Sequence, residues 1–442
     1  MDRLSGVSRR DFLRRTAATA GALAVPTIIP SRVWAQSPGE KLTLGFIGTG
    51  GRGQWLMDAF MGMADVQVVA VSDVDRGRVE EAKKKVEGKY AEAAKSGTYK
   101  GCTAYRDFRE LTARKDIDAV VIASPDHWHA LHSIAALRGG KHVYCEKPLA
   151  NSVAEGRAIA NAVKASGKTF QVGSHERSTG SIRQACELVR NGRIGELKRV
   201  KINLPCDEAH HKDARSFTTI PAAEPIPDGF DYDMWLGHTP LAPYCARRCH
   251  FWWRFNLTYG GGEMTDRGAH VLDIAQLGAN LDNTGPVKIE AKGVRNANSL
   301  YNAFWDYKFT FTYANGLTFE GSTDGPRGLK FEGTTGSIFV AIHGGALTAE
   351  PAGLLDWKIA DNDIQLGRSP GHQRNFLDSI KSGKPTMAPA EAGHRTASLC
   401  HLANIAMAVE RPLKWDPAKE RIAGDAEASA LLSPKMRKPW HL

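Results

Sequence analysis

The sequence predicts an α/β fold: an N-terminal doubly wound parallel sheet, followed by a C-terminal α+β domain with an open, mostly antiparallel sheet. Between residues 41 and 173, short apolar strands alternate with helical stretches, which is typical of a parallel sheet covered by helices. Beyond residue 174, alternating strands are separated by longer irregular stretches rich in Pro, Gly and Trp. At 442 residues, with 42% hydrophobic and 24% charged side chains, the chain is long enough for two globular domains.

The strands expected in the first domain are continuous apolar runs. Such runs indicate strands that are buried on both faces, as in a parallel sheet. The first run leads directly into a glycine-rich segment, and the second ends at Asp73. The expected strands are 41–48, 66–73, 118–124, 141–145 and 169–173, and the expected helices are 54–63, 76–95 and 128–138.

The second domain has a different sequence pattern, in which apolar and polar residues alternate along each strand. This alternation predicts a sheet with one buried and one exposed face. Its expected strands are 197–204, 286–295, 303–313, 317–322, 329–333 and 337–341, and its expected helices are 178–191, 372–382 and 391–410. The predicted division is an N-terminal segment at 1–35, a first domain at 36–174 and a second domain at 175–442.

The N-terminus is typical of an export signal. Ser8-Arg9-Arg10-Asp11-Phe12-Leu13 precedes a mildly apolar stretch that ends at Val33-Trp34-Ala35, a small-residue cleavage site. The pattern resembles a twin-arginine signal, so we expect export of the folded protein by the twin-arginine machinery to the periplasm or another extracytoplasmic space. A disordered basic tail and an uncleaved anchor remain alternatives.

The charge distribution argues against a nucleic-acid partner. The formal net charge is +10, but residues 1–35 hold six arginines against two aspartates. Removing these from totals of 58 basic and 48 acidic residues leaves 52 and 46, a net charge of +6 without a dominant basic run. The seven cysteines do not form a disulfide framework. A Cys245–Cys249 disulfide is one alternative, and two unpaired thiols are the favoured one.

The segment Gly48-Thr49-Gly50-Gly51-Arg52-Gly53 is predicted to bind a dinucleotide. It lies between a strand and a helix, and Asp73 follows 25 residues after Gly48 at the end of the next strand. Gly48 permits the tight turn, Gly50 lets the backbone approach a pyrophosphate, and Gly53 allows close packing of helix on strand. A carboxylate at Asp73 accepts hydrogen bonds from ribose hydroxyls and so favours NAD. Nearby arginines leave NADP open: Arg52, Arg76 and Arg78.

Ser124-Pro125-Asp126-His127-Trp128-His129 follows the third strand, at the edge where doubly wound sheets bind ligands. Ser124, Pro125 and His129 are therefore predicted to contact the cofactor. Alternatively, His129 has only a packing role. Asp126 is a candidate for capping the following helix. His127 and His129 do not share a helix face, which argues against a metal pair.

Glu146-Lys147-Pro148 comes at the end of the fourth strand, about a hundred residues after the glycine loop. Together with that loop, Gly140-Lys141-His142-Val143 and the later Asp266-Arg267-Gly268-Ala269-His270, it resembles the glucose–fructose oxidoreductase/inositol dehydrogenase/rhizopine catabolism (Gfo/Idh/MocA) family. The twin-arginine pattern, Trp235-Leu236-Gly237 and the Trp-containing C-terminus are similar to its exported members.

The resemblance implies a Rossmann domain followed by a larger domain whose sheet often forms an oligomer interface. It also implies oxidation or reduction at a carbinol carbon. Lys147, Asp266 and His270 match the family's catalytic lysine, aspartate and histidine, and Glu146 matches a glutamate close to the nicotinamide ribose.

Removing hydride from a CH–OH carbon requires that the hydroxyl proton also leaves. An imidazole titrates near neutrality, so His270 is predicted to be the general base. Lys147 is predicted to donate a hydrogen bond to the reacting oxygen. Asp266 is predicted to orient His270 or to bind a neighbouring sugar hydroxyl. Structural roles remain alternatives: a surface lysine, a helix-capping aspartate and a packed histidine.

The substrate pocket is less predictable, because Ser174-His175-Glu176-Arg177 departs from the Asn or Arg that family members often carry after the strand near residue 173. Candidates for stacking on a sugar, with core packing as the alternative, are Tyr232, Trp235, Trp252, Trp253 and Arg254. No metal site is predicted: Asp207, Glu208, His210 and His211 are the one cluster with suitable ligands, and they are expected in a solvated loop.

These observations predict an exported oxidoreductase. It would transfer a hydride between a tightly bound nicotinamide cofactor, NAD or NADP, and a sugar, polyol or glycoside, and it would form a homo-oligomer, a dimer or tetramer. One alternative is a redox-neutral NAD-dependent glycosidase or lyase that acts through a transient 3-keto glycoside. The other is a non-catalytic nucleotide-dependent binding protein.

Overall fold

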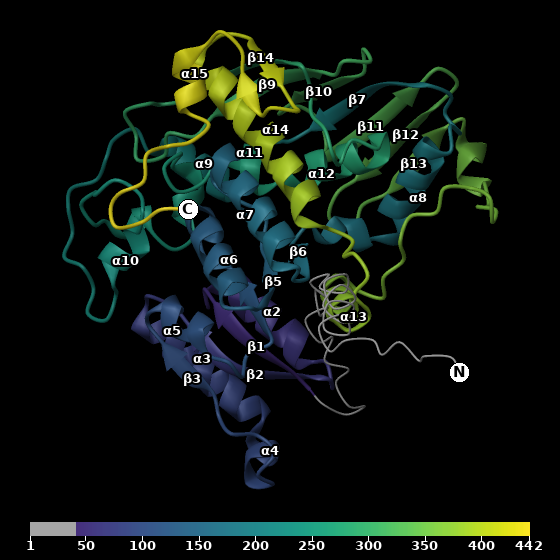
Figure 1. Ribbon diagram of the computed structural model, residues 1–442. Helices are drawn as coiled ribbons and strands as arrows, with labels where there is room; N and C mark the ends of the chain where they lie inside the picture. The colour runs from purple at the N-terminus through teal and green to yellow at the C-terminus, as the bar shows by residue number, and fades with distance from the viewer. Residues whose placement is uncertain (1–40) are drawn as a thin grey trace, which may run out of the picture. The chain divides into compact units, whose positions relative to one another are not determined.

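The computed structural model describes residues 41–442, which form one compact unit (Figure 1). The predicted signal segment at 1–35 lies outside the described residues. Among residues 41–442, no helix is both long and apolar enough to cross a membrane.

The first sheet is parallel throughout and has the strand order β3-β2-β1-β4-β5-β6. The order reverses between β1 and β4, and at such a point the carboxyl ends of the strands open a ligand-binding crevice. The prediction of a doubly wound sheet is confirmed, and β3 is added to it. The strands are β1 (Leu42–Ile47), β2 (Val66–Ser72), β3 (Thr103–Tyr105), β4 (Ala119–Ile122), β5 (His142–Cys145) and β6 (Phe170–Val172).

Helices connect these strands: α2 (Gly51–Met61), α3 (Arg76–Lys89), α4 (Ala91–Lys95), α5 (Phe108–Ala113), α6 (His129–Arg138) and α7 (Val153–Ser166). A single helix over 76–95 was wrong, because the chain leaves helical geometry at Tyr90. Tyr90 is buried, and its ring packs 4.8 Å from that of Tyr99. Burying this aromatic ring turns the chain between α3 and α4. The unpredicted α5 begins at Asp107, whose side chain accepts a hydrogen bond from the Arg109 amide.

The second sheet has the order β13-β12-β11-β7-β10-β9-β8-β14-β15. β7 and β10 pair in parallel and the other pairs that join the sheet are antiparallel, so the predicted open, mostly antiparallel sheet is confirmed. Its strands are β7 (Leu197–Asn203), β8 (Lys288–Val294), β9 (Trp305–Thr312), β10 (Thr318–Ser322), β11 (Gly328–Gly333), β12 (Ser337–Ala341), β13 (Leu347–Glu350), β14 (Leu413–Asp416) and β15 (Arg421–Ile422). The last three were not predicted.

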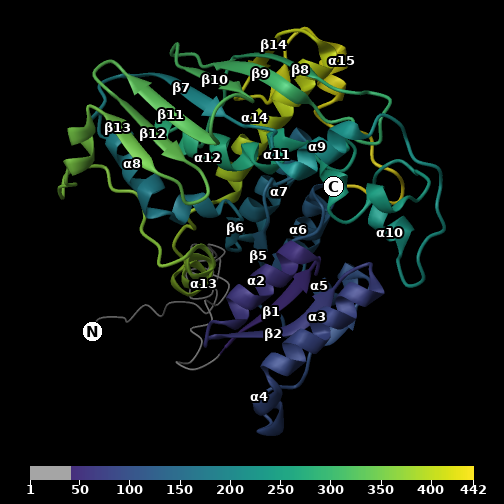
Figure 2. The same cartoon turned by 180° about the vertical axis from the view of Figure 1, so that it is seen from behind.

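One face of the second sheet forms the larger apolar core. Along β9, Trp305, Tyr307 and Phe309 are buried, whereas Asp306 and Lys308 between them are exposed. α8 (Gly180–Arg190), α12 (Gly268–Ala279) and α14 (Ala390–Val409) cover the buried face, and both views show α12 and α14 between this sheet and β6 (Figures 1 and 2). The remaining helices are α9 (Ala209–Ser216), α10 (Tyr232–Leu236), α11 (Glu263–Asp266), α13 (His372–Ser382) and α15 (Ala426–Ala430).

A short connection links the two sheets. The first sheet ends at Val172 and the second begins at Leu197, with a 3₁₀ turn, η2 (His175–Ser178), and α8 between them. The domain boundary at residue 174 stays a prediction.

Candidate active site

The glycine loop leaves no room for side chains at two positions. Gly48 has a φ of +84°, and a Cβ there would lie 2.5 Å from the amide nitrogen of Ser124. A Cβ on Gly53 would lie 2.1 Å from the carbonyl oxygen of Gly48. α2 therefore starts directly against β1, and its first amides lie at the carboxyl edge of the sheet. A helix N-terminus in this position binds a pyrophosphate.

Asp73 lies just beyond β2 and faces the same loop. Its carboxylate accepts hydrogen bonds from the amides of Thr49 at 2.7 Å and Asp75 at 3.0 Å. Burial raises the pKa of Asp73, and the two amide bonds oppose that rise. These bonds fix the carboxylate at the wall of the cavity, where it can accept hydrogen bonds from ribose hydroxyls.

A cavity of about 620 Å³ brings most of the predicted site residues together. Gly53, which packs α2 on β1, and Trp252 do not line it. The predicted residues in its wall are Gly48, Gly50, Gly51, Arg52, Asp73, Ser124, Pro125, His129, Glu146, Lys147, Trp235, Trp253, Arg254, Asp266 and His270.

Lys147 and Asp266 form an ion pair across the cavity. Lys147 follows β5, and its peptide bond to Pro148 is cis. Its ammonium donates to Asp266 Oδ1 at 2.5 Å and to the Asp266 carbonyl oxygen at 3.0 Å. An ammonium has three donors, so one remains for a substrate oxygen.

The charge of Asp266 results from two opposing effects. Burial raises the pKa of this carboxyl group, but the positive charges of Lys147, Arg254 and Arg267 outweigh burial and hold the pKa well below its usual range. Asp266 is therefore ionised. Its carboxylate accepts hydrogen bonds from Lys147 and Arg267, and none from His270. The arrangement supports a role for Asp266 in holding the lysine rather than the histidine.

His270 lies in the first turn of α12 and is 4% exposed. Burial, the positive charge of Lys147 and the neighbouring histidines lower the pKa of His270 well below 6.5. Its Nδ1 is buried and has no hydrogen-bond partner among the described residues. The ring is thus a neutral imidazole with an available lone pair at pH 7, which is the form a general base needs.

His129 holds the lysine segment in place. Its Nδ1 lies 2.7 Å from the Pro148 carbonyl oxygen, and its Nε2 lies 3.0 Å from the Ser124 carbonyl oxygen. Burial lowers the pKa of His129, so the neutral ring donates to one of the two carbonyls. His129 therefore connects the loop after β4 to the segment that carries Lys147.

Glu146 and Arg52 are joined by an ion pair of 2.8 Å from Oε1 to Nε. Glu146 is 4% exposed, and a Cβ on Gly173 would lie 2.8 Å from its carboxyl group. The Arg52 guanidinium also lies over the ring of Trp55, 4.3 Å from its centroid. These contacts fix the arginine beside the glycine loop.

The predicted sugar-binding residues divide into two groups. Trp235 and Trp253 line the cavity, and the Arg254 guanidinium lies over the Trp253 ring, 4.5 Å from its centroid. Trp252 instead stacks on Tyr301, with ring centroids 5.8 Å apart, and packs against the larger core. Tyr232 is also buried, and its hydroxyl donates to the Pro243 carbonyl oxygen.

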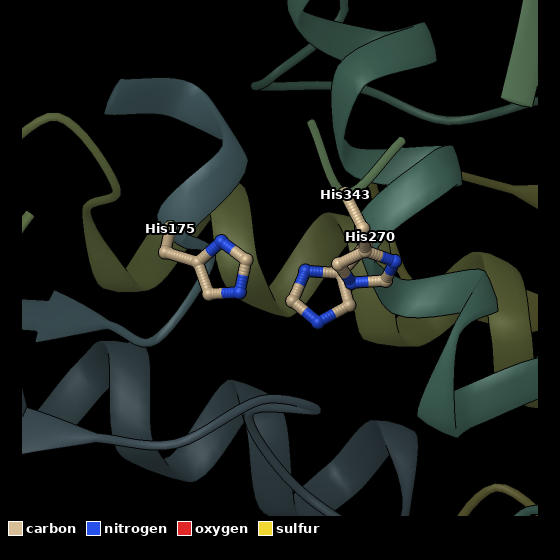
Figure 3. Close-up of side chains that lie close together, drawn as sticks. All are labelled: His175, His270 and His343. Atoms are coloured by element: carbon tan, nitrogen blue, oxygen red, sulfur yellow. The ribbon is translucent and has the colours of Figure 1, made fainter. Parts of the chain in front are cut away.

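Two histidines of the cavity, His175 and His343, were not predicted as site residues. Their rings lie beside His270, with centroids 4.8 and 5.0 Å from it (Figure 3). His175 belongs to the segment that departs from the family pattern, which was a usable signal. His343 lies in a connection between strands, and no spacing in the sequence links it to the other two. Further lining residues outside the predicted set include Asp126, His250 and Phe251.

The cluster Asp207, Glu208, His210 and His211 does not lie in a solvated loop. It forms the start of α9, where Glu208 and His211 cap the helix. Glu208 also accepts hydrogen bonds from Arg267 at 2.9 Å and from Arg327 at 2.7 Å. His211 Nε2 lies 3.0 Å from Glu263 Oε2 in the core. All seven cysteines, including Cys245 and Cys249, lie in the described part of the chain and are free and buried.

In comparison with known proteins, the segments that form the two sheets match models of one protein family. A family model described as the NAD-binding Rossmann fold of an oxidoreductase family (Gfo/Idh/MocA) matches residues 42–174. A second model, described as the C-terminal alpha/beta domain of that family, matches residues 180–442.

Among curated relatives, an inositol 2-dehydrogenase/D-chiro-inositol 3-dehydrogenase of Shouchella clausii is 34% identical over 178 residues, which are 40% of this chain and 47% of that protein. An alpha-N-acetylgalactosaminidase of Tannerella forsythia is 29% identical over 206 residues, 43% of each chain. The chain thus spans less than half the length of each of these relatives.

Among solved structures, the aldose-aldose oxidoreductase of Caulobacter crescentus, complexed with glycerol, aligns over 85% of this chain and 100% of that one, with a TM-score of 0.60 and 19% identity. The WlbA dehydrogenase of Bordetella pertussis, in complex with NADH and UDP-GlcNAcA, aligns over 85% of this chain and 99% of that one, with a TM-score of 0.59 and 16% identity. These likenesses show the shared fold. Because the matching family models span both sheets, the chain belongs to the Gfo/Idh/MocA oxidoreductase family, with an NAD-binding Rossmann fold at its N-terminal side.

Proposed function

We propose that this protein is an exported oxidoreductase that moves a hydride between a tightly bound NAD and a carbinol carbon of a sugar, polyol or glycoside. The observation that carries the proposal is the arrangement of one cavity. An ammonium (Lys147), an ionised carboxylate (Asp266) and a neutral imidazole (His270) line it together with the glycine loop.

The described residues fit NAD. Side chains at Gly48 and Gly53 would collide with the backbone, so only glycines allow the loop to pack this closely. The close packing leaves the amides at the start of α2 free to bind a pyrophosphate. Asp73 would hold the ribose hydroxyls, and its negative charge disfavours a 2′-phosphate at the same place. When bound, the nicotinamide accepts or returns the hydride.

The two catalytic groups, His270 and Lys147, act on the substrate hydroxyl that becomes a carbonyl. His270 takes the hydroxyl proton, because its lowered pKa keeps the ring neutral and its lone pair available. Lys147 donates its third N–H to the same oxygen and stabilises the negative charge that develops there. Asp266 is a positioning residue, since it binds the ammonium through both its side chain and its carbonyl oxygen.

The cavity wall favours a polyhydroxylated substrate. Trp235 and Trp253 offer apolar ring surfaces, and Arg254 adds hydrogen-bond donors beside them. Such a pairing of aromatic face and polar donor suits a sugar ring, which has C–H groups on its faces and hydroxyls at its rim. The relatives named as acting on inositol and the structure named as an aldose-aldose oxidoreductase support this substrate class.

The twin-arginine pattern within residues 1–35 supports export. Outside the cytoplasm no nicotinamide pool replenishes the cofactor, so NAD enters before export and stays bound. The hydride then returns on site, to a second carbonyl compound. We also propose a homo-oligomer, a dimer or tetramer, which light scattering of the mature protein measures directly.

A second candidate is a redox-neutral glycosidase or lyase, favoured by the similarity to the alpha-N-acetylgalactosaminidase. Oxidation at C3 of a glycoside would acidify the neighbouring C–H, and loss of that proton would expel the aglycone. In a glycosidase a water would then add in place of the aglycone, and the hydride would return to C3 of the same sugar. Release of aglycone without accumulating reduced cofactor supports this candidate. A stable keto sugar with reduced cofactor supports the first.

The test replaces Lys147 by methionine, which removes the ammonium and keeps the length of the side chain. We expect Lys147→Met to reduce hydride transfer by about 100- to 1000-fold, because the developing oxyanion loses its donor. NAD content, measured by mass spectrometry after denaturing release, should be retained. The matched control is Lys164→Met on the exposed side of α7. Wild-type turnover in Lys147→Met would refute the assignment.

A further inference from the structure

The proposed hydride transfer gives a role to His270 but none to its two neighbours, His175 and His343, which form a cluster with it. One ring nitrogen from each residue lies within 4.8 Å of those of the other two. The three residues come from η2, from α12 and from the connection after β12, and their rings lie close together (Figure 3). All three line the cavity that contains Lys147.

A buried carboxylate fixes the backbone that carries His343. Glu176 is 2% exposed, and its Oε1 accepts a hydrogen bond from the His343 amide at 2.9 Å. The same oxygen lies 3.7 Å from His175 Nδ1. His343 has a φ of +69°, a left-handed conformation that is uncommon for this residue type. The connection after β12 is thus held in a specific shape beside η2.

One ring nitrogen of the cluster is buried without a hydrogen-bond partner within the described part of the chain. His270 Nδ1 is buried and unpartnered. Two other buried histidines, His127 and His394, also have an unpartnered Nδ1, but each of them is bonded through Nε2, to the Trp235 carbonyl oxygen and to Glu420. Buried polar atoms usually have partners, so an unpartnered nitrogen in a cavity indicates a ligand.

We propose that the three imidazoles bind one divalent transition metal ion of the zinc type. Three protein nitrogens and an open position are a common set for zinc at catalytic sites. Bonds of about 2.0–2.1 Å in a tetrahedron place ligand nitrogens about 3.3 Å apart, so small ring rotations close the cluster. Glu176 Oε1 lies 3.7 Å from His175 Nδ1 and would become the outer carboxylate of a metal-bound His175 only by moving into hydrogen-bond range.

The inference shares His270 with the proposed function and extends it. When the metal is bound, the lone pair of His270 is used as a ligand and no longer removes a proton. A water on the open position has a pKa near about 7 and takes over as the base. Within residues 41–442, the cations near the cluster are all paired with carboxylates: Lys147 with Asp266, and Arg267 and Arg327 with Glu208.

The experiment uses the untagged mature protein, from which a chelator has removed bound metal and which is then titrated with Co²⁺. We expect one Co²⁺ per chain, with the visible d–d bands of a low-coordinate nitrogen site, and displacement by Zn²⁺. His343→Asn and His175→Gln should each weaken binding by at least about 100-fold, since loss of an outer-sphere partner alone costs about 10- to 100-fold. Asn tolerates the left-handed conformation at residue 343.

The matched control is His441→Gln, at an exposed position, which should bind Co²⁺ as the wild type does. Retained NAD content and circular dichroism in each variant show that the fold is intact. Absence of a saturable Co²⁺ spectrum in the wild type, or an unchanged affinity in His343→Asn, would overturn the proposal. Sugar oxidation without metal binding removes this inference alone, whereas metal binding without hydride transfer removes the proposed function alone.

Discussion

At the residue scale, the site depends on which charges neighbour each titratable group. Asp266 and Asp126 are both buried carboxyl groups in one cavity, yet their pKa values shift in opposite directions. Burial raises the pKa of Asp126 well above its ordinary value, and nearby Lys147 only partly opposes this. At Asp266, three cations reverse the effect of burial. The ionised carboxylate is therefore the one that contacts the lysine.

The lowered pKa of His270 predicts the acidic limb of the pH–activity profile. In the presence of a chelator, kcat/KM for sugar oxidation should be maintained down to pH values below about 6.5, the ordinary pKa of histidine. Activity falls only where the buried ring takes up a proton. His270→Asn should reduce kcat by about 100- to 10,000-fold and retain bound NAD.

The measurement is kcat/KM for the wild type between pH 5 and pH 8, a range chosen to bracket the ordinary histidine pKa of about 6.5. His441→Asn, at an exposed position, serves as the control. An acidic limb centred at or above the ordinary histidine pKa would contradict a buried neutral base at this position.

At the element scale, the glycine loop places α2 against β1. Gly53→Ala adds a Cβ at 2.1 Å from the Gly48 carbonyl oxygen, so α2 must shift. We expect a loss of about 1–3 kcal/mol in the free energy of unfolding, as for other overpacked sites, together with reduced NAD content. Urea unfolding and mass spectrometry measure the two effects.

The control for this substitution is Gly88→Ala in α3. A Cβ at Gly88 meets no atom within 4 Å, and the position is exposed. Alanine is the better helix former, so stability should rise by about 0.5–1 kcal/mol. Equal effects of the two substitutions would mean that the contact between Gly53 and Gly48 does not limit the packing of α2.

Some helices and strands could be predicted from sequence patterns and others could not. The long apolar and alternating strands were predictable, because their period of side-chain burial is local information. β3, β14 and β15 contain three, four and two residues, too few for a period to be recognised. The interruption at Tyr90 depends on the ring of Tyr99, a contact that no local pattern predicts.

At the scale of the whole molecule, buried neutral histidines make stability depend on pH. His401 is 7% exposed on α14, and burial lowers its pKa to about 4 although its bond to the Ala150 carbonyl opposes this. The unfolded chain binds this proton first, near pH 6.5. The contribution is therefore complete above about pH 6.5 and is lost as the pH falls towards the folded value.

His401→Gln removes this titration and keeps a donor for the Ala150 carbonyl. Between about pH 6.5 and pH 4, the wild type should lose about 3 kcal/mol more than the variant, from a shift of about 2.5 units at 1.36 kcal/mol each. Urea unfolding at several pH values provides the comparison, with His441→Gln as control. Parallel pH dependences of wild type and His401→Gln would contradict the prediction.

The sequence by itself determined the two sheets, the glycine loop with Asp73, and the motifs that carry Lys147, Asp266 and His270, because burial periods, turn residues and strand-end motifs are local features. Only the tertiary structure decided that Asp266 contacts the lysine and not the histidine, that Trp252 packs on Tyr301, and that His175 and His343 lie beside His270. These contacts join residues far apart in the chain. Their distances depend on how η2, α12 and the connection after β12 pack together, and no local pattern in the sequence encodes that packing.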